Sequence, residues 1–282
     1  MNTLKVGLLM AALTALFVTM GNVLGGTSGM IIAVLFAAVM NIGTYWFSDK
    51  IVLSMTRAQP VSPQQAPELY SMTQSLAQKA EIPMPRLYIV PDPSPNAFAT
   101  GRNPANGVVA VNEGLLNILN REEIEGVIAH EIAHIKHRDT LTSAIVATLA
   151  GAISGIANML MWSSLLGGGD EDNPNPLGAL LMMVLAPMAA MMIQFAVSRA
   201  REFEADKTAA ILTGNPNGLK SALVNLHRGV AARPSHVNPS MAQMCIVNPF
   251  SGGMSIAKLF STHPPMEERV RKLDELARSM GR

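Results

Sequence analysis

Charged residues are scarce in this chain, and three long stretches contain none. Asp, Glu, Lys and Arg make up 15% of the 282 residues, against about a quarter in an ordinary soluble domain. The uncharged stretches are residues 6–48, 140–169 and 173–198. About 20 apolar residues cross a bilayer, so the first stretch can hold two helices separated by a glycine-rich turn near 21–29. Each of the others can hold one, and we expect four transmembrane helices.

A cleaved signal peptide is the alternative for the first of these helices. Lys5 would supply its positive end, but no small-residue cleavage motif follows residues 17–24. A second apolar segment begins at once, which is unusual after a signal peptide. We therefore expect an uncleaved helix.

Cysteine is almost absent, since Cys245 is the only one. A single cysteine cannot form an internal disulfide, which agrees with a reducing compartment. The net charge of +1 gives no sign of nucleic-acid binding. The short links inside the two predicted hairpins carry no Lys or Arg, so the positive-inside rule places both termini and the remaining segments in the cytoplasm. Nothing in the composition indicates an oligomeric state.

These segments divide the chain into four parts. Residues 1–48 form the first transmembrane pair and residues 140–198 form a transmembrane hairpin. Residues 49–139 and 199–282 form the two halves of one cytoplasmic domain, which together are long enough for a core of their own.

Helix and strand patterns alternate in the soluble halves. Residues 66–80 have the spacing of a helix with a proline in its first turn. Residues 86–90 predict a strand, and residues 96–100 and 107–111 predict a hairpin. An edge strand of such a sheet could pair with an extended peptide, while an ordinary packing strand is the alternative.

The motif that carries chemistry is HEIAH at residues 130–134. It lies in a predicted helix over residues 120–138, so His130 and His134 share one face. Two histidines at this spacing can hold one metal ion, and Glu131 then lies beside the ion as a general base. His137 is only three residues after His134 and could be a ligand only if the helix turned toward the metal, so we favour a polar neighbour over a ligand.

The third metal ligand must come from another part of the chain. The predicted hairpin over residues 140–198 returns the chain to the histidines just before Glu202, Glu204 and Asp206. We favour Glu202 as the ligand, with Asp206 one turn later orienting His130. The alternative is that these acids pair with nearby arginines on a solvated face.

Four features follow one another along the chain: HEIAH, the apolar hairpin, SRAREFEAD at residues 198–206 and THPP at residues 262–265. In these motifs the chain resembles the HtpX family of membrane zinc proteases. The family is similar to the CAAX prenyl proteases, which are longer and have more spans. The resemblance implies a zincin-like α+β metalloprotease domain with a small sheet, attached to a mainly α membrane protein. It assigns one Zn²⁺ per chain to His130, His134 and Glu202, general-base catalysis to Glu131, support to Asp206 and His263, and the substrate cleft to Asn96, Ala97 and Phe98.

The function implied by the resemblance is a zinc metalloendopeptidase of the bacterial inner membrane with a cytoplasmic site. Its substrates would be damaged or misfolded membrane proteins and hydrophobic polypeptides near the lipid bilayer, cleaved under stress. A prenyl-protease-like processing peptidase and a non-catalytic scaffold with structural zinc are the alternatives. Structural zinc usually has four Cys or His ligands, which this chain does not offer.

Two further expectations concern a transition-state donor and a loop beside the site. His263 or Arg201 could donate to the transition state, although His263 could instead begin the predicted C-terminal helix at residues 265–280. Residues 234–253 are rich in Pro, Ser, Asn and Gly and predict a long loop. Such a loop could gate the cleft.

Overall fold

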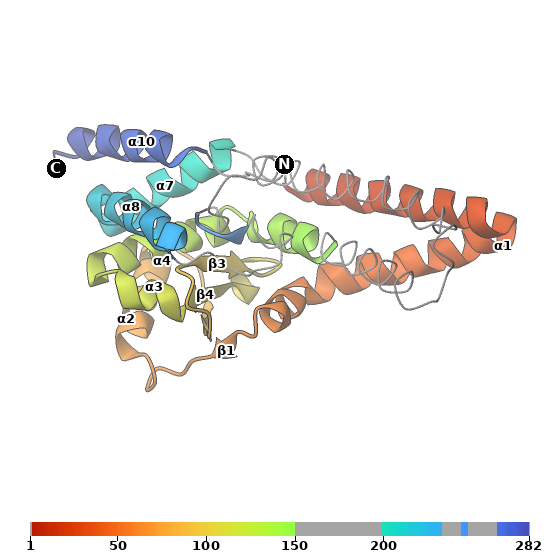
Figure 1. Cartoon of the computed structure of the whole chain (residues 1–282), viewed down its shortest axis with the longest axis horizontal. Coiled ribbons are helices and arrows are strands. Elements are labelled where there is room, and N and C mark those ends of the chain that lie inside the picture. Colours follow the sequence, from red (N-terminus) through yellow and green to blue (C-terminus); the bar gives the residue numbers. More distant parts are fainter. Residues whose placement is uncertain (1, 150–198, 233–243, 248–263, 282) are drawn as a thin grey trace, which may run out of the picture.

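A computed structural model of the chain describes residues 2–149, 199–232, 244–247 and 264–281 (Figure 1). The strands and short helices of the first half are β1 (Gln59–Pro60), β2 (Arg86–Val90), β3 (Ala97–Thr100), η1 (Pro104–Asn106), β4 (Val108–Asn112) and α3 (Glu113–Ile118). The longer helices are α1 (Asn2–Met55), α2 (Pro67–Lys79), α4 (Arg121–Lys136), α7 (Arg199–Thr213), α8 (Pro216–Ala232) and α10 (Met266–Ser279).

Helix α1 folds back on itself as two antiparallel arms, which extend away from the rest of the molecule in Figure 1. The break is at Gly25 and Gly26, whose backbone is not helical. Gly26 has a φ of 57°, a left-handed conformation that glycine adopts without strain. The arms are joined across the bend where Asn41 Nδ2 donates to Thr14 Oγ1 at 2.9 Å. The turn predicted near residues 21–29 is therefore confirmed.

Among the described residues, one helical segment, Gly25–Met55, is long and apolar enough to cross a membrane. It is 11% buried over its most apolar window, and Ile31, Ile32, Leu35 and Ile42 are each more than half exposed. The arm before it contains a shorter apolar helix, Val6–Thr19. Thr140–Leu149 is a further short apolar helix, but the rest of the predicted hairpin over residues 140–198 lies outside the described residues. Of the four predicted membrane helices, the described residues therefore clearly contain one, Gly25–Met55.

The small mixed sheet has the strand order β1-β2-β4-β3. Strands β2 and β4 are parallel, and β3 and β4 form the predicted antiparallel hairpin with Ala99 opposite Val109. Strand β3 is therefore at one edge, and no strand of the described residues pairs with its outer side.

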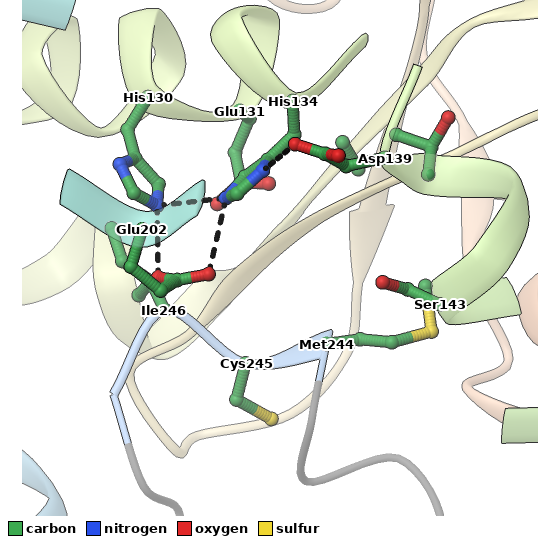
Figure 2. A pocket seen from close by; sticks show the side chains of 11 residues that line it. His130, Glu131, His134, Asp139, Ser143, Glu202, Met244, Cys245 and Ile246 are labelled. Carbon is green, nitrogen blue, oxygen red and sulfur yellow. Dashed lines mark hydrogen bonds and ion pairs between the residues drawn. The ribbon is translucent and has the colours of Figure 1, made fainter. Parts of the chain in front are cut away.

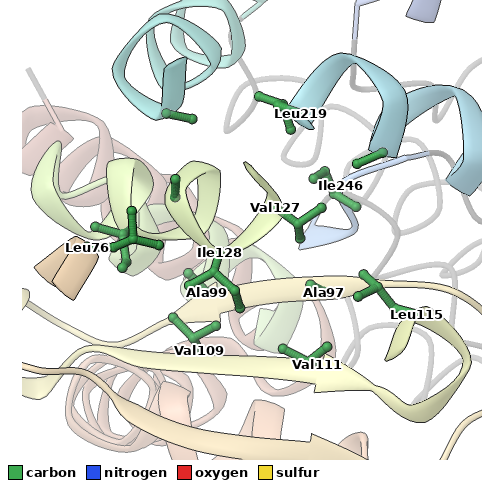
Figure 3. Close-up of a cluster of buried hydrophobic side chains, with 14 of the residues drawn as sticks. Leu76, Ala97, Ala99, Val109, Val111, Leu115, Val127, Ile128, Leu219 and Ile246 are labelled. Carbon is green, nitrogen blue, oxygen red and sulfur yellow. The ribbon is translucent and has the colours of Figure 1, made fainter. Parts of the chain in front are cut away.

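Helix α4 packs between the sheet and helices α7 and α8 (Figure 1). Its start is fixed by the predicted capping box, in which Asn120 and Glu123 bond each other's backbone N–H. Gly126 allows α8 to approach, since a Cβ there would lie 2.6 Å from the backbone N of Leu219. The apolar core on both sides of α4 includes Val127 and Ile128 of α4, Ala97, Ala99, Val109 and Val111 of the sheet, and Leu219 of α8 (Figure 3). Packing on two faces holds the motif helix rigidly.

Candidate metal centre

Three side chains from two helices meet at one point in the centre of the domain (Figure 2). His130 and His134 extend from α4, and Glu202 extends from α7. The two Nε2 atoms are 3.2 Å apart. Glu202 Oε2 is 3.7 Å from His130 Nε2, and Glu202 Oε1 is 3.6 Å from His134 Nε2. All three residues lie against the same pocket.

This triangle has the size of a tetrahedral metal site. Zinc lies about 2.0–2.1 Å from a histidine nitrogen, so tetrahedral ligand atoms are about 3.3–3.4 Å apart. The observed separations of 3.2, 3.6 and 3.7 Å bracket that value. Two nitrogens and one carboxylate oxygen are also the donor set of many catalytic zinc sites. The residues therefore fit a metal ion, and one ligand atom from each of the three lies within 4.8 Å of the other two.

Two other residues near the motif, Glu204 and His137, lie outside the triangle of ligand atoms. Glu204 is exposed on α7, although it is close to Glu202 in the sequence. His137 follows the end of α4, and its Nε2 is 3.4 Å from Thr208 Oγ1. Neither residue belongs to the cluster of ligand atoms, as the sequence predicts.

Glu131 is buried beside the ligand triangle, with 3% of its surface exposed. Burial, helped by the negative charge of Glu202, raises the pKa of its carboxyl to about 7, against the positive charges of His134 and Arg269 and a hydrogen bond from the backbone N–H of Ala99. A general base works best when its pKa is near the working pH. Glu131 therefore has the affinity for protons that its predicted role requires.

The other ring nitrogen of His130 faces Asp206. Asp206 Oδ1 lies 3.0 Å from His130 Nδ1, as predicted. Asp206 is held in turn by the buried Arg269 of α10, whose Nε donates to Oδ2 at 2.8 Å and whose second terminal nitrogen donates to Oδ1 at 2.6 Å. Burial and the positive charges of His134 and Arg269 lower the pKa of His130 to about 4. Asp206 raises it only in part, so the ring is neutral near pH 7.

His134 has a matching partner in Asp139. Its Nδ1 is 3.3 Å from Asp139 Oδ2, and Asp139 Oδ1 accepts a hydrogen bond of 3.2 Å from Arg201. Burial lowers the pKa of His134, but Asp139 and the negative charges of Glu202 and Glu131 outweigh it and raise the pKa to about 9. Arg201, predicted as a possible transition-state donor, thus contacts the aspartate that faces Nδ1 of His134.

The predicted substrate-binding stretch lies on and beside β3. Asn96 is buried, and its amide bonds Cys245 Sγ and the backbone N–H of Ile246. Ala97 and Phe98 lie in two apolar clusters on opposite sides of the sheet, and Ala99 lines the pocket. His263 lies outside the described residues.

Residues 244–246 line the side of the pocket opposite α4 (Figure 2). They belong to the predicted loop over residues 234–253, most of which lies outside the described residues. Besides Asn96, Arg269 fixes them by donating to Ile246 O at 2.8 Å.

The sequence did not reveal the contribution of three parts of the site, which are Arg269, Asp139 and residues 244–246. For Arg269 a weak signal exists, since it shares one helix face with Leu273 and Ala277, both buried. A charged residue on an apolar face indicates a buried partner.

We expect Arg269→Met to destabilise the protease domain by about 3–5 kcal/mol, because it leaves the buried Asp206 carboxylate without its main partner. The free energy of unfolding would be measured by denaturant titration in detergent, followed by circular dichroism. Arg271→Met, at an exposed position of the same helix, is the control. Equal stability of the two variants would contradict the importance of the buried pair.

The site has the features that define a metallopeptidase. These are two histidines one turn apart, a carboxylate between them, an acidic ligand from a second helix and an edge strand alongside. The model of peptidase family M48 matches residues 63–277. The chain belongs to peptidase family M48, and the predicted peptidase class is confirmed.

Relatives at about 50% identity extend this conclusion to the whole chain. A "Protease HtpX homolog" of Persephonella marina is 54% identical over 289 residues, covering 100% of this chain and 99% of its own length. Another of Pelotomaculum thermopropionicum is 51% identical, covering 98% of this chain and 100% of its own. The predicted resemblance to HtpX is confirmed. With the apolar segment Gly25–Met55, the chain is a membrane metalloprotease.

The crystal structure of S. mikatae Ste24p has a similar fold, with a TM-score of 0.51 at 18% identity. The match covers 94% of this chain and 62% of Ste24p. The shared architecture therefore includes nearly the whole chain but only part of the larger protein.

Proposed function

We propose that the protein is a zinc endopeptidase that cleaves membrane-associated or hydrophobic polypeptides at the cytoplasmic face of the bacterial inner membrane. The observation that carries this proposal is the triangle of His130, His134 and Glu202, with the buried Glu131 directly beside it. A structural metal site does not need a base at that position.

The chain's own groups account for the proton transfers of peptide hydrolysis. Zinc held by the three ligands would supply a Lewis acid that activates water and polarises the scissile carbonyl. Glu131 accepts the proton of the attacking water and delivers it to the leaving amine. Its raised pKa of about 7 makes both transfers favourable near neutral pH.

The substrate backbone has a natural partner in β3. This strand pairs with β4 on one side, and it passes Glu131 so closely that the Ala99 N–H bonds the carboxylate. An extended peptide can add to the outer edge of such a strand through main-chain hydrogen bonds. Backbone pairing selects little for side chains, which suits an enzyme that removes damaged proteins under stress.

The way in which α1 joins the domain supports the proposed membrane arrangement. Near the end of α1, Asp49 accepts a 2.9 Å bond from Arg86 of β2, and Arg102 stacks on Trp46 at 4.5 Å. Aromatic and basic side chains of this kind collect at the membrane surface. We therefore place the sheet near the cytoplasmic surface, with four spans in all, two of them in residues 140–198.

Metal removal tests the proposal. We expect a chelator to abolish casein cleavage by the detergent-purified protein, and stoichiometric zinc to restore it, with about one zinc per chain when active. Zinc content would be measured by atomic emission in the same samples. Cleavage that persists after complete metal removal would contradict a zinc enzyme.

A further inference from the structure

Each metal-binding histidine is supported by its own chain of an aspartate and an arginine, although only the support of His130 was predicted. His130 faces Asp206, which Arg269 holds. His134 faces Asp139 at 3.3 Å, and Arg201 donates to the other carboxylate oxygen at 3.2 Å. Both aspartates are buried, at 3% and 4% exposure.

The backbone conformation after α4 fixes the position of Asp139. Helix α4 ends at Lys136, and Arg138 takes a left-handed conformation with a φ of 59°. This turn brings the chain back, so that the N–H of Asp139 donates to His134 O at 3.0 Å. The next residue, Thr140, donates through its hydroxyl to Gly101 O at 2.7 Å, which anchors the turn beside the end of β3. A non-glycine residue in this conformation is uncommon and is retained when its surroundings require it.

We propose that Asp139 is a positioning residue for His134 and that Arg201 acts through Asp139 instead of on the substrate. An aspartate that accepts from Nδ1–H fixes the tautomer of the ring and directs the Nε2 lone pair into the metal site. Arg201 in turn fixes the carboxylate and compensates its buried charge. The inference rests on the proposed function, because it concerns the binding of zinc.

The two members of this pair flank the segment 140–198 in the sequence. Asp139 comes directly before it, and Arg201 follows shortly after it on α7. Their ion pair therefore joins both ends of that segment at the side of His134. The orientation of a metal ligand then depends on how the two ends meet.

Zinc affinity of the full-length protein in detergent tests the inference. The zinc Kd would be measured by competition with a chromophoric chelator for the parent, Asp139→Ala, Asp139→Asn, Arg201→Met and the double variant Asp139→Asn/Arg201→Met. We expect Asp139→Ala to raise the Kd by about 10–100-fold, the range for loss of such a partner. Asp139→Asn keeps an acceptor for Nδ1–H, so we expect a smaller increase.

The double variant tests whether Arg201 affects zinc binding through Asp139. If Arg201 acts through Asp139, adding Arg201→Met to Asp139→Asn changes the zinc Kd by less than about twofold, whereas Arg201→Met alone raises it by several-fold. The control is Asp274→Asn, which breaks a 2.7 Å ion pair with Lys220 between α10 and α8. We expect the parent Kd for it. Thermal unfolding of the zinc-free proteins would separate lost affinity from lost stability.

Three results would overturn the inference. One is a zinc Kd within twofold of the parent in both Asp139→Ala and Arg201→Met, and another is a multiplicative effect in the double variant. The third is a weaker zinc affinity fully explained by unfolding of the zinc-free variants. If the parent itself binds no zinc, the proposed function fails as well. If the parent binds zinc and the variants match it, only the inference fails.

Discussion

Glu131→Gln should lower the rate of peptide cleavage by about 10²–10⁴-fold, the usual contribution of a general base, and leave the zinc content unchanged. Glutamine has the size of glutamate, and its amide oxygen can still accept the Ala99 N–H that bonds the carboxylate. The amide cannot take a proton from water. The three ligand atoms belong to other residues, so the metal should remain.

A quenched fluorescent peptide and casein would report the rate, and zinc would be measured in the same preparation. Glu204→Gln is the matched control, since this acid is exposed on α7; we expect the parent rate for it. Parent-like cleavage by Glu131→Gln would remove Glu131 from the proton transfer. Loss of zinc would instead make Glu131 a ligand.

Glu202→Ala should lose zinc and activity together. Glu202 supplies the only anionic group of the triangle, with Oε1 3.6 Å from His134 Nε2 and Oε2 3.7 Å from His130 Nε2. We expect zinc affinity to fall by more than the roughly 100-fold seen when only a ligand's supporting partner is lost. The buried Arg269 guanidinium, 3.9 Å from Glu202, would then repel the metal with less compensation.

Chelator competition measures this affinity, with Glu204→Ala as the control on the same helix. Activity of Glu202→Ala should return in part at high zinc concentration, while that of Glu131→Gln should not return at any concentration. One zinc retained per chain at parent affinity would show that another residue is the third ligand.

The parts of the fold that could be predicted from the sequence are those fixed by neighbours in the chain. The capping box of Asn120 and Glu123 begins α4 as expected, and residues 66–80 correspond to α2. The break at Gly25 and Gly26 also follows from composition alone. In each case the cause of the structure lies within a few residues of its effect.

The supports of the site could not be predicted because their causes are distant. Arg269 appears in the sequence as one charge among many on an amphipathic helix, and only the packing of α10 on α7 buries it against Asp206. Asp139 looks like the polar end of a helix until the turn at Arg138 directs it at His134. Spacing reveals ligands on one helix, while burial of a charge depends on the tertiary fold.

The sequence positions of the two ion pairs that support the histidines determine the order in which parts of the site are synthesised. Arg201 follows Asp139 by 62 residues, and Arg269 follows Asp206 by 63. A protein emerges from the ribosome N-terminus first, so the histidine pair and Glu131 are made long before Glu202 and both arginines. During its own synthesis the chain therefore carries the base without a complete metal site. The set of metal ligands is complete only after the segment 140–198 and Glu202 have been made, and the Asp206–Arg269 pair behind His130 is complete only after α10.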